Sequence, residues 1–175
     1  MAIDPSTPVL IGCGQITGRA DSCREPLDLA EIALERALDD CGAPGFHDSV
    51  DLIAVSRMGS GAYRNPAGAL RDRRKLTNAR TLVSNFGGQM AHLLVLHAAD
   101  AISKGEAHAA IIAGGELGVG LRMGESTPVT DGTAPEPDPL IGDPMEEWMV
   151  RAEEAALGVT LPIQVYPMLD AAMAL

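Results

Sequence analysis

Apolar positions along the chain form short continuous runs that alternate with longer stretches of helical spacing. The continuous runs are bounded by glycine or polar residues, as is typical of buried strands, and they cover 8–12, 50–55, 80–84 and 108–115. Between them, apolar residues recurring at spacings of three and four predict helices over 26–42, 65–76 and 89–104. This alternation predicts an α/β fold: a layered, mostly parallel sheet with helices on both faces.

The helix boundaries carry local signals of their own. Pro26 suits the first turn of a helix, and Gly42 followed by Pro44 suits its end. In the second predicted helix the basic residues Arg71, Arg73, Arg74 and Lys75 come last, where the helix dipole favours cations. The third predicted helix, 89–104, has little polar face. We therefore expect it to be buried on most sides.

The length of 175 residues corresponds to one main domain, but the character of the chain changes near its end. We expect an α/β domain over 1–123, followed over 124–175 by a loop rich in proline and acidic residues and a helical excursion. The last stretch is an apolar helix without an evident cap, and a four-stranded parallel sheet has edges to be covered. A fragment, or a subunit of a homo- or hetero-oligomer, is therefore expected.

Composition and charge exclude several partners. The formal charge of −11, from 13 basic and 24 acidic side chains, opposes binding to nucleic acid and to anionic membranes. The amino terminus lacks a secretory signal, and charged and histidine residues interrupt each apolar run too early for it to span a bilayer. Three cysteines without C-x-x-C spacing argue against a disulfide framework and suit a reducing cytoplasm.

A glycine-rich turn follows the first predicted strand, over Gly12–Gly18, and Arg57 follows the second strand. Together they suggest a nucleotide-binding oxidoreductase, in which the glycines approach a pyrophosphate and the arginine meets a 2′-phosphate. However, Arg19–Glu25 separate the glycines from the next helix, and the acidic residue expected after the second strand is absent. This interpretation stays an alternative.

The histidines and cysteines do not form a metal-binding pattern. His92 and His97 are five residues apart, which places them on different faces of a helix, without a carboxylate or cysteine at ligand spacing. His92 lies one turn into the third helix, so it either faces a pocket or is a hydrogen-bonded buried histidine. Cys13 can line a crevice, whereas Cys23 and Cys41 suit structural roles. We expect no metal site.

Several ordered motifs resemble the amino-terminal half of the thiolase superfamily, in particular its acetyl-CoA acetyltransferase-like members. The motifs cover most of the chain in the family's order. They are TPVLIGCGQITGR (7–19), PLDLAEIALERALDDCG (26–42), VDLIAVSR (50–57), NFGGQMAHLLVLHAADAISKGEAHAAIIAGGE (85–116) and LPIQVYPMLDAAM (161–173).

The resemblance implies a fold of two similar halves that handles acyl-CoA. In thiolases proper, a cysteine at the start of the buried helix of the first half accepts the acyl group, and a histidine and a second cysteine come from the second half. Here the corresponding position is Gly87 or Gly88. The chain therefore lacks the nucleophilic cysteine, and the motifs of the second half are missing.

The resemblance nevertheless implies acyltransferase or lyase chemistry at a coenzyme A thioester of lipid metabolism, without a covalently bound cofactor. The amides of Gly87, Gly88 and Gln89 are candidate oxyanion donors and His92 a candidate polar partner, with base and acid supplied by another chain. It is equally open that the glycines only tighten the turn. The alternative is a catalytically inactive half-thiolase that binds acyl-CoA or scaffolds an active subunit.

Overall fold

The computed structural model describes residues 4, 6–17, 25–43, 45–118, 140–142, 151–159 and 162–174. The chain divides into two compact units, Met1–Gly142 and Asp143–Leu175. The first unit holds the sheet and all the candidate site residues. The boundary expected between residues 123 and 124 lies outside the described residues.

The first unit is built around a three-stranded parallel sheet. Its strands are β1 (Leu52–Val55), β2 (Arg80–Val83) and β3 (Ala110–Ala113), in the spatial order β2-β1-β3. The central strand β1 is buried at all four positions, as expected for a strand that has neighbours on both edges and helices on both faces.

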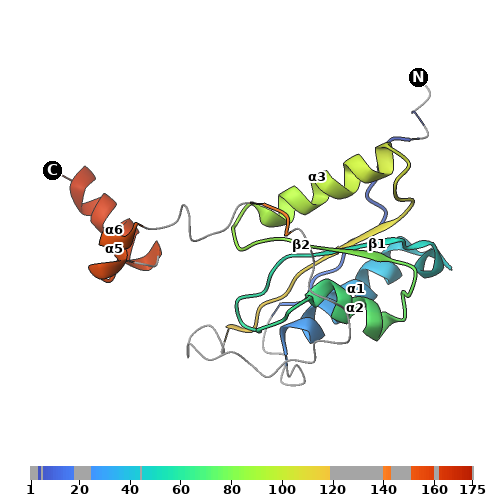
Figure 1. The fold of residues 1–175 in the computed structure, drawn as a ribbon, viewed down its shortest axis with the longest axis horizontal. Coiled ribbons are helices and arrows are strands. Elements are labelled where there is room, and N and C mark those ends of the chain that lie inside the picture. Colours follow the sequence, from blue (N-terminus) through green and yellow to red (C-terminus); the bar gives the residue numbers. More distant parts are fainter. Residues whose placement is uncertain are drawn as a thin grey trace. The chain divides into compact units, whose positions relative to one another are not determined.

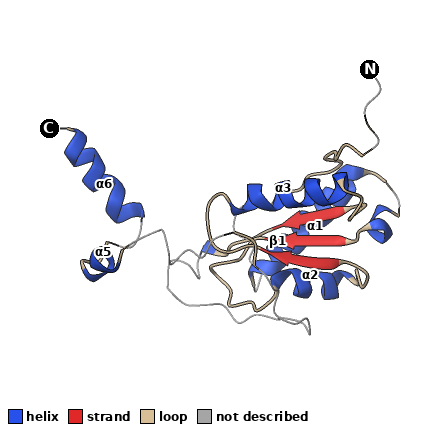
Figure 2. Cartoon of the chain, turned by 45° about the horizontal axis from the view of Figure 1, so that its top comes forward, coloured by secondary structure: helices blue, strands red, loops and turns tan. Residues whose placement is uncertain are grey.

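Helices cover both faces of this sheet, so the expected fold class is confirmed (Figures 1 and 2). Two helices, α1 (Pro26–Cys41) and α2 (Pro66–Arg74), pack on one face, and α3 (Met90–Ser103) packs on the other. A short 3₁₀ helix, η1 (Phe46–Ser49), connects α1 to the sheet.

The helix ends agree with the predicted local signals. Pro26 opens α1, and Gly42 ends it in the left-handed conformation with φ 61°, donating its N–H to the carbonyls near the end of the helix. At the start of α2, the side chain of Asn65 accepts a hydrogen bond of 2.7 Å from the N–H of Gly68. These contacts satisfy backbone groups that a helix end leaves unpaired.

The two faces of the sheet carry cores of different size. Beneath α1 and α2, a large cluster joins aliphatic side chains of both helices to Ile53 and Val55 of β1. Beneath α3, the cluster is small and consists mainly of alanines packed around Leu52. The face of the sheet under α1 and α2 therefore contributes most of the buried apolar area.

Residues 8–12 do not form the strand that their apolar pattern predicts. They pair with no strand of the sheet, and Val9 and Leu10 are 67% and 87% exposed. Gly12 instead packs against α1 so closely that a Cβ atom would lie 2.3 Å from the carbonyl oxygen of Ala37. The segment thus lies against α1, and the sheet of the described residues has three strands instead of four.

The expectation that the third helix is buried on most sides is also wrong for the described residues. Only one flank of α3 is buried, through Met90, Leu94, Ala98 and Ala101. Its opposite flank, although largely apolar in sequence, is open. The exposed positions include Ala91, His92, Val95, Leu96 and His97. Nothing else in the described part of the first unit packs on that flank.

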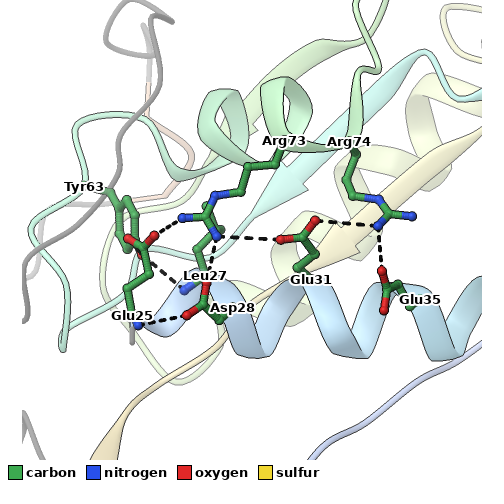
Figure 3. A network of polar contacts seen from close by, with 8 residues as sticks. All are labelled: Glu25, Leu27, Asp28, Glu31, Glu35, Tyr63, Arg73 and Arg74. Carbon is green, nitrogen blue, oxygen red and sulfur yellow. Dashed lines mark hydrogen bonds and ion pairs between the residues drawn. The ribbon is translucent and has the colours of Figure 1, made fainter. Parts of the chain in front are cut away.

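The arginines at the end of α2 bind the first helix in addition to matching the helix dipole. Arg73 pairs with Glu25, Asp28 and Glu31, which lie at the start and along one side of α1 (Figure 3). Arg74 pairs with Glu31 and Glu35 further along. The network therefore joins α1 to α2.

The described residues of the second unit form the helices α5 (Ala152–Ala156) and α6 (Pro162–Met173). Helix α6 confirms the apolar helix predicted at the end of the chain, and it includes Pro167 in its interior. Several of its large apolar side chains are exposed within this unit. No helix among the described residues combines the length and the apolar character that crossing a membrane would need.

Candidate functional site at the carboxyl ends of the strands

Three loops leave the sheet at one edge, because all three strands run in the same direction. They follow β1 at 56–60, β2 at 84–89 and β3 at 114–117. In open parallel sheets, the edge formed by the carboxyl ends of the strands is where ligands bind. This edge is therefore the candidate site.

The elbow between β2 and α3 contains the paired glycines. Gly87 has φ 155°, a conformation that favours glycine, and a Cβ atom there would lie 3.0 Å from Oε1 of Gln89. Gly88 is exposed, and a Cβ atom there would meet nothing within 4 Å. Gly87 is therefore required by the turn, whereas Gly88 leaves the approach to the helix start open.

Two amides directly before α3 are available for a ligand. The carbonyl of Gly87 accepts a hydrogen bond from the N–H of Met90 at 3.1 Å, and the carbonyl of Gln89 accepts one from Leu93. The N–H groups of Gly88 and Gln89 have no acceptor among the described residues. Unpaired amides at a helix start, with its partial positive charge, attract a negatively charged oxygen.

A segment distant in sequence supports the elbow from one side. The N–H and C=O groups of Ile141 bond to the carbonyl of Val83 and the N–H of Asn85, at 2.9 and 2.8 Å. The side-chain amide of Asn85 donates to the carbonyl of Gly142 at 2.6 Å. A Cβ atom on Gly142 would lie 2.5 Å from the sulfur of Met90, so this segment packs directly against the start of α3.

Arg57 lies at the same edge and contacts the elbow. Its guanidinium carbon is 5.2 Å from the centre of the Phe86 ring, within the range of a cation–π contact. Its backbone N–H donates to the hydroxyl of Ser84 at 3.4 Å. Arg57 is exposed and forms no ion pair within the described residues. The site thus includes an exposed cation that lies over the Phe86 ring of the elbow.

The third loop is tied to the first by a carboxylate. Glu116 accepts hydrogen bonds from the N–H groups of Gly59 and Ser60, at 2.6 and 2.8 Å, and from the Ser60 hydroxyl. In return, that hydroxyl accepts a bond from the N–H of Leu117 at 2.8 Å. Because Ser60 is almost fully buried, these bonds fix the relative positions of the two loops.

The structure thus brings some predicted residues together and leaves others apart. Gly87, Gly88 and Gln89 share the elbow with Arg57, whereas His92 lies on the exposed flank of α3. Gly14 packs against the middle of α1 and Gly12 against its last turns, both far from the start of the helix at Pro26. The geometry of a pyrophosphate site, with glycines at a helix start, is therefore not formed there.

Sequence reasoning did not single out Phe86, Asn85 or Glu116. The only local signal was their position, since each follows a strand or a glycine turn. Cys13, expected to line a crevice, is exposed and lines a groove beside β3 that does not include the elbow. Within the described residues, no three His, Cys, Asp or Glu side chains are grouped as a metal site would require.

These features define a layered α/β unit with parallel strands and a glycine elbow that feeds a helix. Its structure is similar to that of an SCP2-thiolase-like protein type 1 from Mycobacterium smegmatis, described as monomeric, with TM-score 0.51 and 28% sequence identity. The fold is thus thiolase-like. The match covers 63% of this chain and 23% of that chain, so this chain spans less than a quarter of its length. No family model and no curated protein matches the sequence.

Proposed function

We propose that this chain binds an acyl-CoA thioester at the elbow between β2 and α3, as part of an acyltransferase or lyase of lipid metabolism. The observation that carries the proposal is the pair of unpartnered N–H groups of Gly88 and Gln89, open to approach, within a thiolase-like fold. These amides suit the oxygen of a thioester or of an enolate derived from it. Arg57 adds a positive charge at the elbow, against the ring of Phe86.

The chemistry requires groups that this chain does not place at the elbow. No cysteine lies there, and His92 projects from the exposed flank of α3. The proposed role of the chain is therefore to orient the thioester and stabilise negative charge on its oxygen, with base and acid from a second thiolase half or another partner subunit. His92 is a proposed polar partner in such an assembly, because its flank is free.

A catalytically inactive half-thiolase is the second candidate, favoured by the absence of a nucleophile at Gly87 or Gly88. This candidate binds acyl-CoA or scaffolds an active subunit, whereas in the first candidate the elbow amides of this chain take part in the reaction. The nucleotide-binding oxidoreductase finds no support in the geometry of Gly12 and Gly14.

Calorimetric titration with acetyl-CoA and acetoacetyl-CoA, against free coenzyme A, tests the proposal. We expect both thioesters to bind more tightly than coenzyme A, because only they present a thioester carbonyl oxygen. Equal affinity for all three ligands, or no binding, would contradict a thioester site at the elbow. Release of coenzyme A by the purified chain alone would exclude the inactive scaffold.

Variants of Gln89 locate the interaction at its backbone. Gln89→Pro removes the N–H group at a φ of −85°, close to the value of proline, whereas Gln89→Ala keeps that group and removes only the side chain. We expect Gln89→Pro to weaken acetyl-CoA binding about tenfold, the equivalent of one hydrogen bond. Gln89→Ala should bind as the unchanged chain does.

A further inference from the structure

Met90 lies between two glycines that come from distant parts of the chain. A Cβ atom on Gly87 would lie 3.1 and 3.2 Å from the Cε and Cγ atoms of Met90, and one on Gly142 would lie 2.5 Å from its sulfur. Met90 is only 2% exposed, so its side chain fills the space that both missing Cβ atoms leave. The side chain is thus a wedge between the elbow and residues 140–142.

The backbone of Met90 also holds the elbow. Its N–H donates to the carbonyl of Gly87 at 3.1 Å. That carbonyl and the N–H of Gly88 belong to the same planar trans peptide, so they point in opposite directions. Fixing the carbonyl therefore fixes the direction of the Gly88 N–H, which is one of the two candidate oxyanion donors.

Asn85 fixes the beginning of the turn through its backbone and its side chain. Its N–H donates to the carbonyl of Ile141 at 2.8 Å, and its side-chain amide donates to the carbonyl of Gly142 at 2.6 Å. Its own carbonyl accepts a bond of 2.8 Å from the hydroxyl of Ser84, which is fully buried. Asn85 therefore ties the elbow to the same segment that packs on Met90.

These contacts close a ring around the elbow. Asn85 bonds to Gly142, which packs on Met90. Met90 in turn packs on Gly87, which lies two residues after Asn85 in the chain. Residues 140–142 are anchored to the sheet as well, through a bridge to the end of β2. Because the ring is closed, the loss of any one contact leaves the turn held from one side only.

We propose that Met90 and Asn85 are positioning residues for the amides of Gly88 and Gln89, an inference that rests on the proposed thioester site. They hold the elbow in the conformation that presents both N–H groups to a thioester oxygen. Both act through the backbone of the elbow and not by contact with the ligand.

The paired glycines explain why the elbow needs such support. A glycine adopts more backbone conformations than any other residue, so Gly87-Gly88 is flexible unless neighbouring atoms restrict it. Donors that are already oriented stabilise negative charge without an ordering cost when the ligand binds. The ring therefore supplies the order that the glycines lack, while Gly88 leaves the approach open.

NMR relaxation of the free chain tests the positioning without any ligand. Met90→Ala removes the wedge, and Leu94→Ala is the matched control, because Leu94 is fully buried on the same flank of α3, about one turn further along. Both variants lose a large apolar side chain, so both should lose stability. Only Met90→Ala should lower the backbone order parameters of Gly88 and Gln89, from about 0.85 to below about 0.6.

Asn85→Ala tests the ring at a second point and leaves the wedge in place. It removes the side-chain donor to Gly142 but keeps the backbone bond to Ile141. Asn78→Ala, in the exposed loop before β2, is its control. Asn85→Ala should lower the order parameters of the same two amides, whereas Asn78→Ala should not. Circular dichroism checks that each variant is folded.

Titration of the four variants with acetyl-CoA and coenzyme A tests the consequence for binding. The two ligands carry the same phosphate groups, so the ratio of their dissociation constants isolates the contribution of the thioester. In Met90→Ala and Asn85→Ala the preference for acetyl-CoA should fall about tenfold, the equivalent of one hydrogen bond, with the affinity for coenzyme A unchanged. Leu94→Ala and Asn78→Ala should keep the preference.

The outcomes separate this inference from the proposed function. Equal affinity of the unchanged chain for both ligands would contradict the proposed function. Ordered elbow amides in Met90→Ala and Asn85→Ala would instead overturn the positioning role. The same follows if Leu94→Ala disorders these amides equally, or if they become disordered while the preference of the unchanged chain for acetyl-CoA persists in the variants.

Discussion

The hydroxyl of Tyr63 donates a hydrogen bond of 2.8 Å to the buried carboxylate of Glu25 and accepts one of 3.1 Å from the N–H of Leu27 (Figure 3). Tyr63 precedes α2, and the other two residues lie at the start of α1. A single hydroxyl thus satisfies a buried carboxylate and a backbone group that the helix start leaves unpaired.

Replacing Tyr63 with phenylalanine should destabilise the first unit by about 2 kcal/mol, because a hydrogen bond to a charged group is lost and the N–H of Leu27 stays buried without an acceptor. Urea unfolding followed by circular dichroism measures the change. The matched control is Tyr166→Phe, at a side chain that is 65% exposed in the second unit. The same loss in both variants would show that the hydroxyl contacts are not responsible.

Arg73 is the centre of the charged network between α1 and α2. Arg73→Gln removes the cation beside Glu25, whose side chain is only 7% exposed, and should cost about 2 to 3 kcal/mol in unfolding free energy. Arg71→Gln is the control, since Arg71 is bonded to its neighbour Asp72 near the surface and should change stability by less than about 0.5 kcal/mol. A small effect of Arg73→Gln would show that its ion pairs contribute little to the packing of α2 on α1.

Asp51 joins the starts of β1 and β3. Its partial burial alone would raise its pKa, but hydrogen bonds from the ring and N–H of His108, and from the N–H of Ala109, outweigh this effect and hold the pKa below its ordinary value of 3.8. A carboxylate with a lowered pKa in the folded state stabilises the fold above its unfolded pKa. That stabilisation is lost as the pH falls through the folded value.

The stability of the unchanged chain should therefore decline as the pH falls below about 4, and Asp51→Asn should remove part of this decline. At pH 7 the same variant should be less stable by about 1 kcal/mol, because it accepts fewer hydrogen bonds. Thermal unfolding at several pH values gives both quantities. Asp48→Asn, at a side chain that is 89% exposed, should keep the decline of the unchanged chain.

The two glycines of the elbow should respond differently to substitution. Gly87→Ala should lower stability by more than about 1 kcal/mol, because φ is 155° and the added Cβ would lie 3.0 Å from the side chain of Gln89. Gly88→Ala should be nearly neutral, since nothing lies within 4 Å of its Cβ. Differential scanning calorimetry compares the two melting temperatures. A large loss for Gly88→Ala would show that this position is closed to a ligand.

The sequence alone determined the elements whose signals are local. Three strand runs, the helix boundaries at Pro26 and Gly42, and the glycine elbow all lie where periodicity, capping and turn chemistry predict them. Such signals depend on residues within a few positions of one another, so they do not require knowledge of the contacts made by the rest of the chain. The α/β fold class followed from their order.

Only the tertiary structure decided which segments meet. Residues 8–12 have the apolar pattern of a strand, but they lie against α1 and pair with no strand among the described residues. The apolar composition of α3 predicts that its side chains can be buried. It does not specify which flank of the helix other segments cover. The pairing of Arg73 with Glu25 joins residues 48 positions apart, and no local pattern specifies a contact at such a separation.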